Sequence, residues 1–161
     1  MKRLFYLLAA AAFTACGSAT TLSVMTFNMR YDNPEDGADN WRFRRGRVAE
    51  VIASHGVDVF GTQELLANQL GDLKRLLPGY AAVGVGREDG AEAGEFSAVF
   101  YRRDRFTPLE SGTFWLSETP DVAGSKGWDG ACERVATWVV LHDREGGREF
   151  LFVSNLLINC I

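Results

Sequence analysis

The first part of the chain alternates between strand-like and helix-like spacings of apolar residues. Residues 21–29 place apolar side chains at a period of two and predict a strand, and residues 57–60 predict a second, short and buried strand. Between them, residues 41–54 carry apolar side chains at helical spacing beneath an arginine-rich face. Leucines repeat at helical intervals over residues 65–77, where Pro78 and Gly79 stop the helix. The predicted order is therefore strand, helix, strand, helix.

Beyond residue 80 the pattern predicts strands only. Five stretches rich in β-branched and aromatic residues are bounded by turn signals: 80–86, 96–102, 106–115, 134–142 and 149–154. Residues 143–148 predict a hairpin connection, whereas residues 31–40 and 117–130 predict loops. A loop of the second length is usually functional or mobile. The pattern as a whole predicts a mixed α+β layered sandwich formed by one domain over residues 21–154.

The first sixteen residues differ in kind from the rest. Lys2 and Arg3 precede an apolar run over residues 4–12, and small residues lead to Cys16. This arrangement is typical of a secretory signal peptide and is too short for a stable membrane span. The segment that ends at Cys16 resembles a bacterial lipobox, so we expect an extracytoplasmic protein anchored through a lipidated Cys16. Ordinary signal cleavage and secretion is the alternative.

Charge and cysteine content narrow the function. The 17 basic and 21 acidic side chains give a formal charge of −4, without the basic character of a dedicated nucleic-acid binder. Phosphate substrates are still compatible with this charge if a bound cation supplies positive charge. Three cysteines are too few for a disulfide framework. A bridge between Cys132 and Cys160 can form in an oxidising compartment, but we expect two separate buried thiols.

Polar residues stand at the ends of two predicted strands. Asn28 closes the first strand, and Gln63 and Glu64 follow the second. Each residue has a structural explanation, since an asparagine can simply end a strand and a glutamate is favoured in the first turn of a helix. For each of these residues alone, the structural explanation is favoured. Only their combination with other motifs indicates an active site.

Five motifs in order carry a resemblance to a known family. They occupy residues 26–30, 58–64, 94–102, 113–117 and 134–138, and read TFNMR, DVFGTQE, GEFSAVFYR, TFWLS and RVATW. Together they resemble the endonuclease/exonuclease/phosphatase superfamily, which includes the DNase I-like nucleases, and above all its small secreted bacterial members. The resemblance implies a four-layered α/β sandwich with two central sheets and a divalent metal at the strand ends, Mg²⁺ or alternatively Mn²⁺.

The resemblance also implies residue roles. Glu64 would ligate the metal, and Asn28 would help to order the metal and phosphate site. Arg134, which enters the strand before Thr-Trp, would lie near the substrate phosphate, and Glu95 would pair with a histidine on a later strand. The substrate would be a phosphoester, either a nucleic acid, a sugar or inositol phosphate, or a phospholipid head group, and the protein would act as a monomer.

The chain departs from the family pattern after Ser154. The pattern requires Thr-His-Leu-Asp, whereas Leu156 stands at the histidine position, and the later Gly-Asp-x-Asn and Ser-Asp-His segments have no counterpart. Residues 155–161 resemble the product of a frameshift or an incomplete gene, and we expect the second sheet to be largely missing. The expected function is therefore a metal-dependent phosphoester hydrolase that is inactive in this form. The alternative is a non-catalytic, lipid-anchored binding protein or a decayed one.

Overall fold

The computed structural model describes residues 20–128 and 130–156, which form ten elements. In chain order they are β1 (Val24–Asn28), the 3₁₀ segment η1 (Pro34–Asp39), α1 (Trp41–Ser54), β2 (Val59–Gln63), α2 (Ala67–Leu76), β3 (Tyr80–Val83), β4 (Val99–Arg102), β5 (Phe106–Trp115), β6 (Val135–Asp143) and β7 (Arg148–Asn155). The predicted signal peptide and the possible lipidation site at Cys16 lie outside the described residues. No helix within the described ranges is long and apolar enough to span a membrane.

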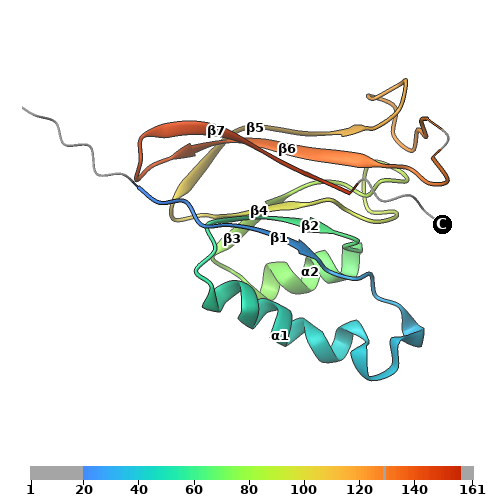
Figure 1. Cartoon of the computed structure of the whole chain (residues 1–161), viewed down its shortest axis with the longest axis horizontal. Helices are drawn as coiled ribbons and strands as arrows, with labels where there is room; N and C mark the ends of the chain where they lie inside the picture. Colours follow the sequence, from blue (N-terminus) through green and yellow to red (C-terminus); the bar gives the residue numbers. More distant parts are fainter. Residues whose placement is uncertain (1–19, 129, 157–161) are drawn as a thin grey trace, which may run out of the picture.

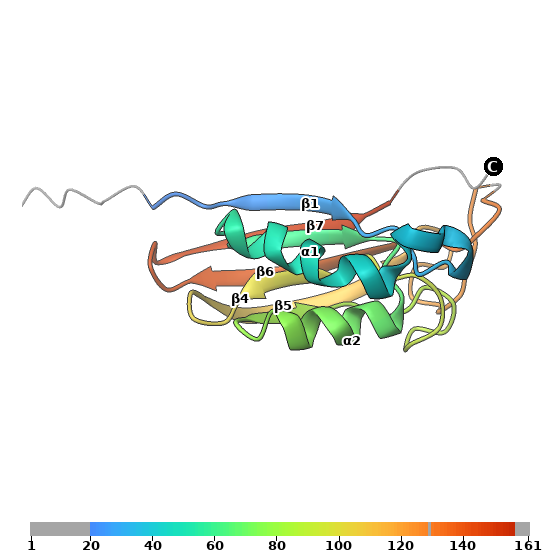
Figure 2. The same cartoon turned by 90° about the horizontal axis from the view of Figure 1, so that it is seen from below.

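The elements stack in three layers (Figure 1). The first sheet has the strand order β1-β2-β4-β3, in which β1 and β2 are parallel and the other neighbours antiparallel. Helices α1 and α2 cover one face of this sheet, and the antiparallel second sheet, β5-β6-β7, covers the other (Figures 1 and 2). This arrangement confirms the mixed α/β sandwich with two sheets that the sequence predicts.

Two apolar cores hold the layers together. Between the helices and the first sheet, Trp41 and Ile52 of α1 pack with Phe60 and Phe100, whose rings stack 4.7 Å apart. Between the two sheets lies the second core, formed by Val59, Val99, Tyr101, Phe106, Val139 and Leu141. Because both faces of β2 are covered, all five of its residues are buried, including the polar Thr62 and Gln63 at its carboxyl end.

Most element boundaries agree with the pattern, and one loop does not. The predicted loop over residues 31–40 contains η1, because Pro34 supplies a suitable φ angle at its start and the Asn33 side chain accepts a hydrogen bond from the Glu35 amide (3.1 Å). Strand β4 begins only at Val99, since Phe96 forms an isolated bridge with Leu65 instead of continuing the ladder. Residues 117–130 contain no helix or strand where the structure describes them.

The second sheet is more complete than expected, but its outer face is open. Its three strands contain 10, 9 and 8 residues and are longer than those of the first sheet. Leu109, Leu151 and Val153 are 47, 61 and 44% exposed. Among the described residues no helix covers this face (Figure 1), so the structure contains three of the four layers that the resemblance implies.

A buried ion-pair network joins the two sheets at the end opposite the carboxyl ends of β1 and β2. The Arg105 guanidinium donates to Asp58, which precedes β2 (2.7 Å), and to Asp143 at the end of β6 (2.8 and 3.1 Å). Arg105, Asp58 and Asp143 are 4, 4 and 6% exposed. The hydrogen bonds from Arg105 lower the pKa of Asp143 to about 2, so the charged network is the favoured state of the folded chain.

We predict that Arg105→Ala destabilises the domain by about 3–5 kcal/mol, because it leaves two buried carboxylates without their partner. Arg102→Ala is the matched control. Arg102 also pairs with Asp58, at 3.4 Å, but is 37% exposed, so its loss should cost less than about 1 kcal/mol. Urea denaturation at neutral pH measures both changes.

The stability contributed by Asp143 depends on pH. Because the pKa of folded Asp143 is depressed to about 2, its stabilisation is complete above the unfolded pKa of about 3.9 and is lost as pH falls through the folded value. Arg105→Ala should remove much of this loss between about pH 5 and pH 2. Equal stability losses for the Arg105 and Arg102 variants would contradict the assigned role of the network.

Candidate active site

The parallel pairing of β1 with β2 brings Asn28 and Glu64 together. Asn28 and Gln63 are register partners at the carboxyl ends of the two strands, and Glu64 follows directly. The Asn28 side-chain amide donates to Glu64 Oε1 at 2.8 Å, while Asn28 Oδ1 accepts a hydrogen bond from the Arg30 backbone amide at 2.8 Å. These two bonds fix the orientation of the Asn28 amide, and Asn28 in turn positions the Glu64 carboxylate.

Backbone strain accompanies this pair. Glu64 and Arg30 have φ angles of 55° and 54°, in the left-handed region that L-residues seldom adopt. Such a conformation costs about 1–3 kcal/mol and persists where the surrounding structure enforces it. The Arg30 carbonyl is held by the Arg44 guanidinium and, at 3.0 Å, by the Gln69 side-chain amide. The strand ends are therefore held in a defined geometry from the helical layer.

Glu95 lies next to this region through the isolated bridge between Leu65 and Phe96, whose amide donates to the Leu65 carbonyl at 2.7 Å. The Glu95 carboxylate accepts a hydrogen bond from Arg87 NH1 at 2.7 Å, and the two side chains are 21 and 16% exposed. Arg87 Nε is the one buried side-chain nitrogen or oxygen atom without a hydrogen-bond partner among the described residues. Within the described residues the partner of Glu95 is therefore Arg87, and the pairing with a histidine stays a prediction.

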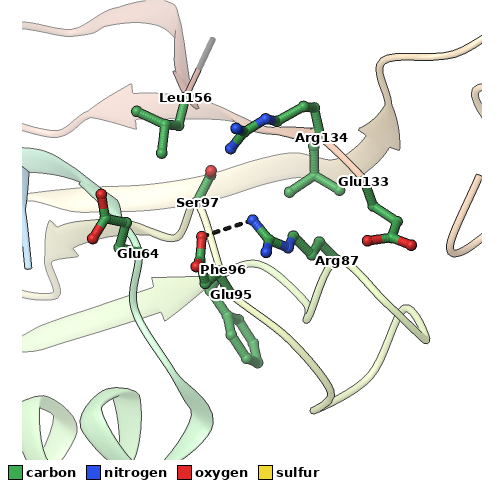
Figure 3. A pocket seen from close by; sticks show the side chains of 9 residues that line it. Glu64, Arg87, Glu95, Phe96, Ser97, Glu133, Arg134 and Leu156 are labelled. Carbon is green, nitrogen blue, oxygen red and sulfur yellow. Dashed lines mark hydrogen bonds and ion pairs between the residues drawn. The ribbon is translucent and has the colours of Figure 1, made fainter. Parts of the chain in front are cut away.

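These side chains line one pocket (Figure 3). Its walls comprise Glu64, Arg87, Glu95, Phe96, Ser97, Glu133, Arg134, Val135 and Leu156. Arg134 directly precedes β6, and its carbonyl accepts from the Leu116 amide at 2.8 Å. Leu156 faces the pocket from the end of β7 (Figure 3). The position where the family resemblance requires a histidine is thus part of this pocket, but it presents an aliphatic side chain.

The charges of the pocket perturb one another. Burial raises the pKa of Glu95; Glu64 adds to the rise, while Arg87 and Arg134 oppose it. Burial lowers the pKa of the Arg134 guanidinium, and the nearby Arg87 charge lowers it further, while Glu95 and Glu64 act in the opposite direction. Three carboxylates and two guanidinium groups line the pocket, counting Glu133, so its formal charge is negative by one before any cation binds.

The donor set bears on the implied metal. No group of three or more His, Cys, Asp or Glu side chains that could hold a metal ion occurs within residues 20–128 and 130–156. Asn28 Oδ1 is engaged by the Arg30 amide, which leaves Glu64 as the protein ligand. Mg²⁺ is often bound through one or two carboxylates, with waters and substrate phosphates completing its shell. The residues present fit such a loosely held Mg²⁺ and do not fit a closed metal site.

The structure brings the four candidate residues of the sequence analysis together and adds two that it did not name. Asn28, Glu64, Glu95 and Arg134 all come from predicted motifs, and the structure gathers them at one end of the sandwich. Arg87 was missed because it belongs to a loop, although its position before a glycine-rich turn and Glu95 was a usable signal. Glu133, beside Arg134 in the sequence, also lines the pocket.

Other polar candidates lie elsewhere. His55 is the C-cap of α1, and His142 lies near the end of β6, 3.8 Å from Glu149, so neither belongs to the pocket. Cys132 is disulfide-bonded, which corrects the expectation of a free thiol at this position. Its partner lies outside the described residues.

The geometry defines an α/β sandwich with a pocket at the strand ends that two arginines and three glutamates line, and the comparisons give its family. The sequence profile described as "Endonuclease/Exonuclease/phosphatase family" matches residues 25–157, so the chain belongs to this family. Its members are phosphoester hydrolases, among them nucleases and phosphatases. No curated protein sequence gives a match.

Solved structures of similar proteins extend beyond this chain. An endonuclease/exonuclease/phosphatase from Bacteroides vulgatus is 47% identical with a TM-score of 0.84, and the match covers 85% of this chain and 52% of that one. A mannosyl-6-phosphatase from Bacteroides thetaiotaomicron is 47% identical with a TM-score of 0.80, covering 83% and 50%. A functionally unknown protein from Enterococcus faecalis is 31% identical with a TM-score of 0.75, covering 81% and 50%. The chain spans about half the length of these relatives.

The strained backbone at Glu64 makes a prediction. Glu64→Gly should be more stable than Glu64→Ala by about 1 kcal/mol, because glycine adopts a positive φ angle without the steric penalty of a Cβ atom. Both variants lose the carboxylate and its bond to Asn28, so the difference reports the backbone alone. Urea midpoints at neutral pH measure it. Coincident unfolding curves for the two variants would show that the left-handed conformation is not under strain.

Proposed function

We propose that this pocket is the metal- and phosphate-binding part of a phosphoester hydrolase site, and that the chain as given binds phosphoesters without turning them over. The observation that carries the proposal is the Glu64 carboxylate, oriented by Asn28 at 2.8 Å, in a pocket that also contains Arg87 and Arg134. A carboxylate for a cation beside two guanidinium groups for an anion is the combination that phosphoryl chemistry requires.

The charge balance supports metal dependence. Three carboxylates against two guanidinium groups repel a phosphate until a cation compensates for the excess negative charge. Glu64 would hold Mg²⁺ or Mn²⁺, which when bound polarises the phosphoryl group and offsets developing charge. Arg134 would donate to phosphate oxygens through its planar fork. Arg87, whose Nε lacks a partner, would supply a second donor while holding Glu95.

The proposal of inactivity rests on the composition of the pocket. Hydrolysis needs a group that activates water, and none of the described side chains that line the pocket is a histidine. Leu156, in the place that the family assigns to a histidine, cannot accept a proton. General-base assistance alone contributes about 10²–10⁴-fold to such reactions. The same feature supports the alternative of a non-catalytic binding protein on a lipid anchor.

The named relatives and the charge of the chain guide the choice of substrate. A relative with 47% identity is named a mannosyl-6-phosphatase, which supports a sugar phosphate over the nucleic acids and phospholipid head groups. The formal charge of −4 disfavours long DNA, whose nonspecific affinity comes mainly from cationic side chains. We propose that the chain binds a small phosphomonoester as a monomer.

The first test is metal-dependent phosphate binding. Calorimetric titration with inorganic phosphate should show weak binding that Mg²⁺ strengthens about tenfold or more, because the cation reverses the charge of the pocket. Glu64→Gln should abolish the effect of Mg²⁺, and Arg134→Ala should weaken binding with and without it. Glu110→Gln, an exposed glutamate on β5, is the matched control. A Mg²⁺ effect that persists in Glu64→Gln would place the metal elsewhere.

The second test is turnover. The 161-residue chain should not hydrolyse p-nitrophenyl phosphate or bis-p-nitrophenyl phosphate in the presence of Mg²⁺ or Mn²⁺, since no histidine lines the described pocket to activate water. A complete homologous domain provides the positive control. The variant Leu156→His tests whether a histidine at this position restores hydrolysis. Metal-dependent hydrolysis by the unmodified chain, abolished by Glu64→Ala, would show that the chemistry does not need the absent base.

The third test concerns location, which we propose to be extracytoplasmic with anchoring through Cys16. The motivation is the charged start and apolar run of residues 1–16. Expressed in a bacterial host, the chain should fractionate with membranes, and Cys16→Ala should release it. Thr20→Ala, a substitution just after this segment, is the control. Soluble material from both the unmodified chain and Cys16→Ala would favour simple secretion instead.

A further inference from the structure

We propose that the loop formed by residues 116–134 contains a binding subsite for the sugar of a sugar phosphate, with the Trp128 indole as its platform and Glu118 and Lys126 as its polar contacts. The inference deepens the proposed function and rests on it, because the phosphate of the same ligand would lie in the pocket of Glu64 and Arg134.

Trp128 lies outside both cores of the described chain. Its side chain is 68% exposed, the largest exposed fraction among the large apolar residues of the described chain, so it contributes little to either core. Its φ angle is 50°, the third positive φ of a non-glycine residue after those of Arg30 and Glu64. An exposed indole held at a conformational cost indicates selection for a surface role.

A second pocket surrounds this indole. Glu118, Lys126, Gly127, Trp128 and Gly130 line it, and it contains about 580 Å³ of space, including open solvent. The pocket thus combines a flat apolar ring with a carboxylate acceptor and an ammonium donor. Small-molecule sites commonly unite an aromatic surface with a few orienting polar groups.

The loop that presents these side chains is braced from within. Ser117 and Ser125 hydroxyls lie 2.7 Å apart, Ser125 also donates to the Thr119 carbonyl at 3.0 Å, and the Thr119 amide donates to Ser117 at 3.1 Å. Gly127 packs so tightly that a Cβ atom there would lie 2.4 Å from the Ser117 Cα. Trp128 therefore extends from a defined framework, which lowers the entropic cost of binding.

The subsite adjoins the phosphate pocket. Lys126 Nζ lies 3.4 Å from the Glu133 carboxylate, and Glu133 lines the pocket of Glu64, Arg87 and Arg134. Trp115, which directly precedes the loop, also contacts this region, because its indole donates to the carbonyl of Arg87 at 2.6 Å. The loop lies at the end of the sandwich to which β1 and β2 point (Figure 1). The Lys126–Glu133 ion pair therefore connects the linings of the two pockets.

The chemistry of the subsite favours a sugar. A pyranose has an apolar C–H face that can pack on an indole ring, and its hydroxyl groups can donate to Glu118 and accept from Lys126. A polynucleotide would need a track of cations along its backbone, whereas Lys126 is the one cation that lines this pocket in the described chain, and it is paired with Glu133. A mononucleotide that stacks its base on Trp128 is the competing ligand.

The experiment compares four ligands on the full chain in the presence of Mg²⁺: mannose 6-phosphate, mannose, inorganic phosphate and adenosine monophosphate. We expect mannose 6-phosphate to bind about five- to tenfold more tightly than inorganic phosphate, in line with one aromatic contact. Trp128→Ala should reduce its affinity to that of inorganic phosphate without changing the latter. Phe43→Ala is the matched control, since Phe43 on α1 is 60% exposed and does not line this pocket.

The outcomes separate the two proposals. Equal affinities for mannose 6-phosphate and inorganic phosphate, no effect of Trp128→Ala, or tighter binding of adenosine monophosphate would each overturn the sugar subsite and leave the phosphate site standing. If inorganic phosphate does not bind, the proposed function fails. In that case the Trp128 indole N–H resonance, assigned through Trp128→Phe, decides the subsite alone. A shift on addition of mannose supports it, and no shift overturns it.

Discussion

The site depends on the parallel, in-register pairing of β1 and β2. Because the two strands run in the same direction and end at partnered residues, Asn28 and Gln63, the residues that follow them emerge at the same edge of the sheet. Two contacts form at this edge. Asn28 donates to Glu64, and the bridge between Leu65 and Phe96 places Glu95 beside them. At the opposite end of the sandwich, the hydrogen bonds from Arg105 to Asp58 and Asp143 hold the second sheet against the first. They thereby help to set the position of β6, which Arg134 directly precedes.

Charge, more than shape, determines what the pocket can do. Burial and mutual repulsion raise the pKa of Glu95, while the two neighbouring arginines oppose the rise. The formal charge of the pocket is −1, with three carboxylates and two guanidinium groups. A single divalent cation would therefore make it positive and able to bind an anion. The left-handed backbone at Glu64 adds a conformational cost at the residue that would hold this cation, as expected where position is enforced by the surroundings.

The proposed subsite in the loop over residues 116–134 would give the site a second level of selectivity. Phosphate binding alone would accept any phosphoester, whereas a preformed aromatic platform next to it distinguishes between the groups that the phosphate carries. Trp128, held outside both cores, and Lys126, paired with a residue that lines the phosphate pocket, connect these two levels. The open outer face of the second sheet plays no part in this arrangement.

The sequence by itself determined most of the elements and four candidate site residues. The predicted bounds of α1 and β5 agree with the structure to the residue, and five short motifs in order singled out Asn28, Glu64, Glu95 and Arg134. Only the tertiary structure decided that Arg87 pairs with Glu95, that Leu156 lines the pocket, and that Cys132 is disulfide-bonded. These contacts join loops and strand ends far apart in the chain, where no periodicity constrains the side chains and only packing of the layers sets their distances.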